Sequence, residues 1–266
     1  MKHCKTCHSQ LNGNFCSQCG EKVIADSDFS LVKIVGSAFG SITNLDSKIF
    51  KTLKLLLFYP GKLTTKFVEG VRVPYMKPFQ IFVISNIVFF IFLQDIDLFR
   101  TPSKWFFIED FDGIRVLDQV RAIAINQGLE ISDLAHKYDL KTSALAKGLI
   151  VLLIPFIALI GKLLNPKSSI KFGKHIIFAT HYFAFVLILF VIVAQVIEAF
   201  TSDLSKWMFI IPITIIMLIY YILGMKYFYK NSWIGSVLKG LGGVFLINLC
   251  IQVYKMMINL LVLNTL

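Results

Sequence analysis

Apolar residues gather in five long segments, and these segments predict the architecture of the chain. They cover residues 79–95, 146–164, 176–199, 207–228 and 240–263. A helix needs about 20 mainly apolar residues to cross the hydrocarbon core of a bilayer, and the first segment is the shortest. We therefore expect an all-α polytopic membrane protein with about five transmembrane helices. The first span covers 79–95, and the other four form a bundle within residues 146–266.

The region before the first span has a helical rather than a continuous apolar pattern. Residues 28–58 predict two amphipathic helices, separated by a break at residues 44–47. The second helix carries its lysines on one side, at Lys48, Lys51 and Lys54. A basic amphipathic helix next to a span is typical of a helix that lies on an anionic leaflet. Packing against the protein's own bundle is the alternative.

The remainder of this juxtamembrane region, which extends over residues 28–78, is punctuated by turn residues. Pro60-Gly61 stops the second amphipathic helix, and a short third helix ends at Gly70. A basic, proline-containing collar with Arg72 and Lys77 then leads into the first span.

Residues 96–145, between the first two spans, predict a small folded cap outside the membrane. Asp112-Gly113 is a hairpin turn signal, flanked by the β-prone runs 105–108 and 114–116. A helix is expected from Val116 to Gln127 with Gly128 as its C-terminal stop, and a second short helix after Ser132.

Composition and charge agree with a membrane protein and orient it. The chain is 56% hydrophobic, its mean hydropathy is +0.71 and its formal net charge is +11. Basic residues dominate three regions: the segment before residue 79, the loop after the second span and the loop after the fourth. The segment 95–141 holds nine acidic against six basic residues. Because lysine-rich loops stay inside, we expect a cytoplasmic N-terminus and an extracytoplasmic C-terminus.

Four of the five cysteines form the clearest chemical motif. Cys4, Cys7, Cys16 and Cys19 make two C-x-x-C pairs, and four thiolates can close a tetrahedral zinc site. Residues 1–24 therefore predict a zinc ribbon, with zinc in a structural role because four cysteines leave no open position for a substrate. Reduced cysteines also favour a cytosolic location for this segment. Few basic and aromatic residues accompany the motif, so nucleic acid is not the expected partner.

Polar residues inside the third span are the next candidates. His175 and His181 are six positions apart, about 240° around a helix, so they cannot easily chelate one ion together. His181 and Gln195 share a face, and Glu198 follows at the outer end of the span. A proton- or ion-handling site and plain hydrogen bonding between helices are the two interpretations.

The last span carries a polar stripe on an otherwise apolar helix. Asn248, Gln252, Lys255 and Asn259 follow i, i+4, i+7, i+11 spacing. Lipid disfavours such a stripe, so we expect it to face the bundle interior or a wet cavity, with Glu198 as a partner for Lys255. The alternative is adhesion between helices plus one snorkelling lysine. Small residues earlier in this segment, Ser236, Gly240 and Gly243, predict close helix packing.

Three stretches of the chain together carry a family resemblance. They are the knuckle 15–20, the juxtamembrane residues 59–78, and the run from 147 through Ile154-Pro155 to His175, His181 and Phe185. With these features the chain resembles an uncharacterised, domain-of-unknown-function family of Bacteroidetes-type integral membrane proteins with an N-terminal Cys4 zinc ribbon. The resemblance implies a bacterial inner-membrane protein and supplies no established activity.

Enzyme signatures do not occur in the sequence. It contains no Walker loop, no G-x-S-x-G, no H-E-x-x-H and no paired carboxylates within a span. The first hypothesis is an interaction, scaffold or sensing protein whose zinc ribbon docks a cytosolic protein. The second is a small-solute or ion transporter whose polar path is lined by the third and fifth spans. A membrane enzyme acting on lipid is the third.

Overall fold

The computed structural model describes most of the chain. The described residues are 3–11, 13–24, 48–93, 97–108, 110–111, 114–166, 169–200 and 206–266. The first expected amphipathic helix, the Asp112-Gly113 turn and Lys167 lie outside them. The chain divides into two compact units. Unit 1 contains Met1–Phe92 and Ile154–Leu246, and unit 2 contains Leu93–Leu153 and Ile247–Leu266.

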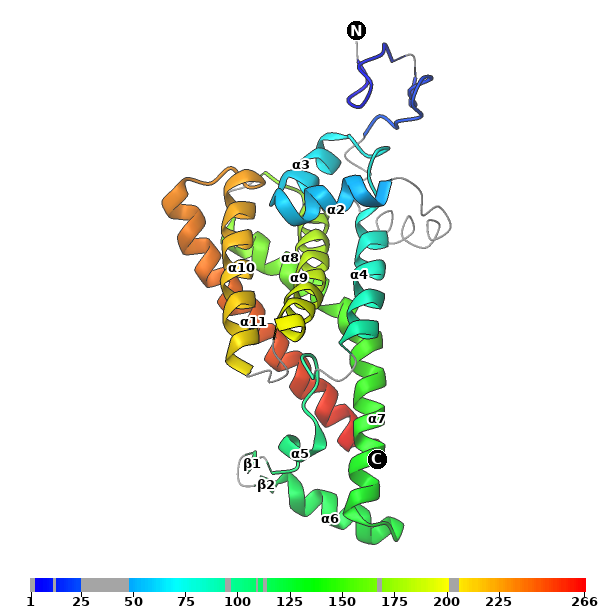
Figure 1. Cartoon of the computed structure of the whole chain (residues 1–266), viewed down its shortest axis with the longest axis vertical. Coiled ribbons are helices and arrows are strands. Elements are labelled where there is room, and N and C mark those ends of the chain that lie inside the picture. Colours follow the sequence, from blue (N-terminus) through cyan, green and yellow to red (C-terminus); the bar gives the residue numbers. More distant parts are fainter. Residues whose placement is uncertain are drawn as a thin grey trace. The chain divides into compact units, whose positions relative to one another are not determined.

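The described chain is almost entirely helical, which confirms the all-α polytopic class (Figure 1). Its helices are α2 (Lys48–Phe58), α3 (Lys62–Glu69), α4 (Pro78–Phe92), α5 (Ser103–Phe106), α6 (Val116–Gln127), α7 (Ile131–Leu149), the 3₁₀ turn η2 (Ile150–Leu152), α8 (Leu153–Leu164), α9 (Phe172–Phe200), α10 (Lys206–Tyr227) and α11 (Trp233–Leu263). Two short strands, β1 (Asp110–Phe111) and β2 (Ile114–Arg115), pair antiparallel.

Among the described residues, four helical runs are long and apolar enough to cross a membrane. They are Ile131–Leu164, Phe172–Ala199, Ile210–Tyr227 and Trp233–Leu263. The remaining expected span, the first in the chain, corresponds to the shorter apolar helix α4, with 15 residues. At 1.5 Å per residue α4 is about 22 Å long, less than the roughly 30 Å of a hydrocarbon core.

Helix α9 is the centre of unit 1, because most of it is buried by its neighbours. Phe82 of α4 stacks on Phe183 with their ring centroids 5.8 Å apart. On α10, Tyr221 meets Tyr182 edge to face at 4.9 Å. Aromatic rings bury large apolar areas, so these contacts fix α4 and α10 against α9.

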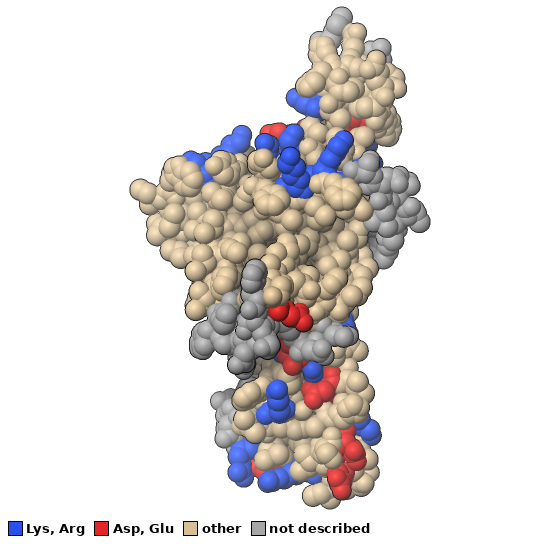
Figure 2. Space-filling view, viewed as in Figure 1, with Lys and Arg blue, Asp and Glu red and all other residues tan. Residues whose placement is uncertain are grey.

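Helices α2 and α3 close one end of unit 1. The Tyr220 hydroxyl of α10 donates to the Leu56 carbonyl of α2 at 2.7 Å. Between the two helices, Gly61 has φ 77°, and a Cβ there would lie 3.4 Å from the Phe228 backbone nitrogen. The expected stop at Pro60-Gly61 is therefore also a packing site. On the visible face, Lys and Arg gather over α2 and α3, and the neighbouring long helices present a broad uncharged surface (Figure 2).

Unit 2 is a folded cap, and two expectations about it need correction. Residues 105–108 were expected to be β-prone, but Trp105 lies in α5. The Asp139 carboxylate accepts hydrogen bonds from the Ser103 backbone N–H at 3.0 Å and hydroxyl at 2.6 Å, which stabilises the first turn of α5. Asp139 also pairs with Arg100 at 2.8 Å. The antiparallel pairing of β1 and β2 agrees with the expected hairpin.

The second correction concerns the short helix expected after Ser132. The expected short helix after Ser132 is α7, which continues through η2 and α8 without a break in helical structure. Residues 134, 138, 142 and 146 are buried at helical spacing on α7, so one side packs in the cap while the other is polar. The tightening at η2 precedes Pro155, which cannot donate a backbone hydrogen bond to the preceding turn.

The core of unit 2 joins the cap helices to the end of the last span. Its buried members are Phe106, Phe107, Val116, Val120, Ala124, Leu134, Tyr138, Val262 and Leu263. Phe106 stacks on Tyr138 with a centroid distance of 5.5 Å. Helix α6 has the predicted bounds, and Gly128 ends it with φ 63°. The end of α11 therefore belongs to the cap's core as well as to the expected bundle.

Candidate metal centre and buried polar contacts

The two C-x-x-C segments fold into matching knuckles. Cys4 accepts at its carbonyl from the His8 N–H at 3.0 Å, and Cys16 accepts from the Gly20 N–H at 2.9 Å. His8 and Gly20 take the same left-handed backbone conformation, with φ of 61° and 72°. Gly20 therefore takes the left-handed position of the second knuckle, and His8 occupies the equivalent position in the first.

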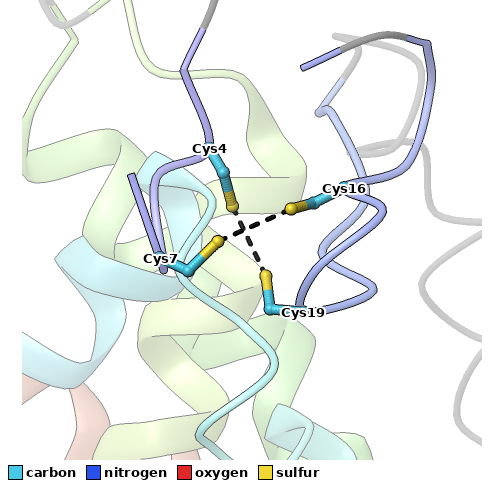
Figure 3. A group of neighbouring side chains, drawn as sticks. All are labelled: Cys4, Cys7, Cys16 and Cys19. Atoms are coloured by element: carbon cyan, nitrogen blue, oxygen red, sulfur yellow. Dashed lines mark hydrogen bonds between the residues drawn. The ribbon is translucent and has the colours of Figure 1, made fainter. Parts of the chain in front are cut away.

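The four sulfur atoms converge on one point (Figure 3). The Sγ atoms of Cys4 and Cys19 are 3.5 Å apart, as are those of Cys7 and Cys16, and all four lie within 4.8 Å of one another. Tetrahedral zinc with sulfur ligands at about 2.3 Å separates the sulfurs by roughly 3.8 Å. The cluster can therefore hold a metal ion, and its four ligands would fill the coordination sphere.

Ser9 supports the thiolate form of this cluster. Its hydroxyl oxygen lies 3.0 Å from the Sγ of Cys7 and 3.0 Å from that of Cys16. A hydroxyl that donates to a thiolate favours the charged form, and the single proton of Ser9 can serve one of these two sulfurs at a time. The contact lowers the pKa of Cys7 and lowers that of Cys16 to about 6. Metal binding needs deprotonated cysteines, and Ser9 reduces the cost of removing the proton.

The residue after the second knuckle connects the ribbon to the collar. Glu21 is 5% exposed, and its Oε2 accepts a hydrogen bond from the Thr6 hydroxyl at 2.6 Å. The same oxygen accepts from the backbone N–H groups of Arg72 and Val73, at 2.9 and 3.0 Å. Hydrogen bonds to a carboxylate are about twice as strong as neutral ones. Glu21 thus joins the first knuckle, the second knuckle and the collar through one atom.

The collar in turn contacts helices α3 and α9. The Arg72 guanidinium lies over the Phe67 ring at 4.7 Å from its centroid, and its Nε donates to the Phe67 carbonyl. Phe67 packs with Ile177 of α9, and Ile24 of the ribbon lies against this pair. Phe67 also meets the His181 ring edge to face at 6.3 Å. A continuous set of contacts therefore leads from the ribbon to α9.

Both histidines of α9 are buried and hydrogen-bonded to another segment. His181 Nδ1 lies 2.9 Å from the Thr64 hydroxyl of α3, and His175 Nδ1 lies 2.8 Å from the Tyr229 hydroxyl. These bonds fit the interpretation of His181 and His175 as contacts between helices. Gln195, on the same helix, is exposed and donates to Glu198 at 3.3 Å.

The structure separates the four members of the polar stripe on α11. Asn259 is buried, and its Oδ1 is 3.5 Å from the Thr101 N–H. Lys255 is half-buried within electrostatic range of Asp97. Asn248 and Gln252, which also belong to unit 2, are exposed. The expected pairing of Lys255 with Glu198 joins residues of different units and stays a prediction.

Sequence reasoning missed Glu21, Thr64 and Tyr229. Glu21 had a usable signal, since it is the single acidic residue among the first 24 and directly follows the second knuckle. Thr64 and Tyr229 had none, because their partners are more than 50 residues away and hydrogen bonds between distant helices leave no local pattern.

The helices and the cysteine cluster define a class: a multi-pass membrane protein with an N-terminal site that could hold a metal. Residues 46–90, which include α2, α3 and most of α4, are similar to the family described as Protein of unknown function (DUF3667). This agrees with the resemblance to an uncharacterised family. The matched segment contains the collar and Thr64, and ends before the cap. Neither the curated proteins nor the solved structures gave a match.

Proposed function

We propose that this chain is an inner-membrane protein that uses a cytosolic zinc ribbon for interaction or sensing, without catalysis of its own. The observation that carries the proposal is the buried carboxylate of Glu21, which holds ribbon and collar together. A protein partner that binds the ribbon, or loss of its zinc, would change the hydrogen bonds that Glu21 makes to the collar just before α4. Binding at the ribbon would then affect the membrane helices, because the ribbon is not structurally independent of them.

The arrangement of unit 1 supports the proposed cytoplasmic N-terminus. The turn between α2 and α3 packs against the end of α10 at Phe228, and α3 packs against the first half of α9 at His181. The lysine-rich connections around these helix ends therefore share the end of the unit that carries the basic helix α2. Under the positive-inside rule this end faces the cytosol, together with the reduced cysteines.

Hydrogen exchange on the full-length protein in lipid nanodiscs tests the connection. Glu21→Gln, or zinc removal with a chelator, should speed exchange of the Arg72 and Val73 amides by about tenfold or more, because hydrogen bonds to a charged group contribute roughly 1.5–3 kcal/mol. Glu69→Gln is the matched control, since Glu69 is exposed and should leave these amides unchanged. Unchanged exchange after both treatments would show that the ribbon does not act on the collar.

A transporter is the alternative, and one observation favours it. The Nε2 atom of His181 is buried and has no hydrogen-bond partner among the described residues. Burying an unpaired polar atom is costly, so a polar ligand or ion passing this point would relieve that cost.

Replacing His181 and Lys255 should abolish transport but leave partner capture intact. Cys4→Ser should abolish partner capture if the ribbon is an interaction module.

A further inference from the structure

Two lysines of unit 1 share one asparagine at the basic ends of its helices. The Lys239 ammonium of α11 donates to Asn231 Oδ1 at 2.7 Å and to Asn165 Oδ1 at 2.9 Å. The Lys226 ammonium of α10 donates to the backbone oxygen of Asn231 at 3.2 Å. Asn165 follows α8, Lys226 lies at the end of α10 and Asn231 precedes α11, so three helix ends contribute to this group.

The asparagines are held in position by further hydrogen bonds. Asn165 is 4% exposed, and its Nδ2 donates to the Gly161 carbonyl at 2.9 Å. Asn231 Nδ2 donates to Asn165 Oδ1 at 2.9 Å and to the Met225 carbonyl at 3.1 Å. With both amide nitrogens engaged, both side-chain oxygens are available to Lys239. The ammonium groups are therefore positioned by the fold and differ from mobile surface lysines.

This group is positively charged, and the described part of the chain places no acidic partner against it. Both lysines are half-buried, and within the described residues neither forms an ion pair. The sequence has no Asp or Glu at 154–197 or at 206–246. An ammonium has three N–H donors. The hydrogen bonds to Asn165 and Asn231 use two donors of Lys239 and one donor of Lys226. A partly desolvated pair of cations with donors to spare is suited to bind an anion.

The surface next to these lysines is suited to acyl chains. Large apolar side chains are exposed along the first four turns of α11: Trp233, Ile234, Val237, Leu238, Leu241 and Phe245. The Lys226 ammonium lies over the Trp233 ring at 5.3 Å from its centroid. Tryptophan beside lysine is typical of the headgroup level of a membrane, with apolar side chains below it facing lipid tails.

We propose that unit 1 binds one anionic glycerophospholipid at this place. Its phosphate accepts hydrogen bonds from Lys226 and Lys239, and its acyl chains lie along the apolar face of α11. The site is distinct from the lysines of α2, which are exposed and would attract an anionic leaflet without selecting a single lipid. It does not depend on the ribbon or on transport.

Native mass spectrometry of the full-length protein, released from detergent with added lipid, tests this proposal. Phosphatidylglycerol should remain bound at one copy, and phosphatidylcholine should not. Lys226→Met combined with Lys239→Met should weaken phosphatidylglycerol binding by roughly 25-fold, because each lysine at a membrane surface contributes about a fivefold gain in affinity. Lys51→Met combined with Lys54→Met removes the same charge from α2 and should change binding less than twofold.

An arginine variant and a competition with free phosphate complete the lipid-binding experiment. Arginine at positions 226 and 239 retains the charge and should retain the lipid, which separates loss of charge from loss of fold in the methionine pair. Inorganic phosphate at millimolar concentration should not displace the lipid. Equal retention of the two lipids by the wild-type protein, equal losses in the two methionine pairs, or displacement by free phosphate would each overturn the proposal.

Discussion

At the scale of single residues, the two knuckles differ in how well their sequence suits the backbone they share. Gly20 takes its left-handed conformation at no steric cost, whereas His8 takes it with a side chain attached. A residue with a Cβ in this conformation costs about 1–2 kcal/mol relative to the right-handed one. His8 is exposed, so its imidazole gains little packing in return. The first knuckle is therefore the weaker half of the site.

His8→Gly should consequently strengthen metal binding, and Gly20→Ala should weaken it. A Cβ at Gly20 would meet nothing within 4 Å, so the effect of alanine comes from the backbone alone. We expect about 1 kcal/mol in each direction, or roughly fivefold in zinc affinity measured by competition with a chromophoric chelator. His8→Ala is the control, because it removes the imidazole and keeps the left-handed strain. A loss of affinity in His8→Gly would indicate that the imidazole takes part in binding.

At the scale of helices, small residues decide how α10 and α11 meet. A Cβ at Gly240 would overlap the side chain of Ile222, and one at Gly243 would overlap the ring of Tyr221. Ser236 is fully buried in the same segment. The expected close packing is confirmed at Gly240 and Gly243, between α10 and α11 within unit 1. Gly242, between them, would meet nothing within 4 Å and provides a natural comparison.

Valine at these positions should separate the two helices selectively. Gly240→Val has to displace Ile222, and overpacking of this kind costs about 1–3 kcal/mol. Gly242→Val faces open space and should leave stability unchanged or slightly higher, since glycine is a poor helix former. Thermal unfolding in detergent, followed by tryptophan fluorescence, compares the two variants. Similar destabilisation by both would mean that the α10–α11 contact does not control stability.

Helices and their ends could be predicted where the cause is local. The bounds of α6 and the stop at Gly128 follow from apolar spacing and one glycine, and the cysteine cluster follows from ligand spacing. The full length of α7 could not be found from average apolarity, because this helix buries only one side and is polar on the other. The partners of Glu21 and His181 depend on how distant segments meet, which no local pattern records.

At the scale of the whole molecule, orientation depends on whether α4 crosses the membrane. It is the apolar helix that follows the basic helix α2 and the short helix α3 and precedes the acidic, folded cap in the chain, and it is about 8 Å shorter than a typical hydrocarbon core. A short span can be accommodated by local bilayer thinning at a modest cost. The charges favour crossing, since lysines lie on its N-terminal side and acidic residues on its C-terminal side.

A cysteine introduced on either side of α4 decides the question in a Cys250→Ser background, with its label told apart from that of the four ribbon cysteines by mass spectrometry of the labelled peptides. In intact spheroplasts, a membrane-impermeant thiol reagent should label Asn126→Cys on α6 and should fail to label Lys51→Cys on α2, because both positions are exposed and only the first would face outward. After permeabilisation both should react, which controls for accessibility. Labelling of Lys51→Cys with protection of Asn126→Cys would invert the topology. If the two positions react alike in intact spheroplasts, α4 does not cross. The cap then shares the side of the ribbon, and the assignment of α4 as the first span is wrong.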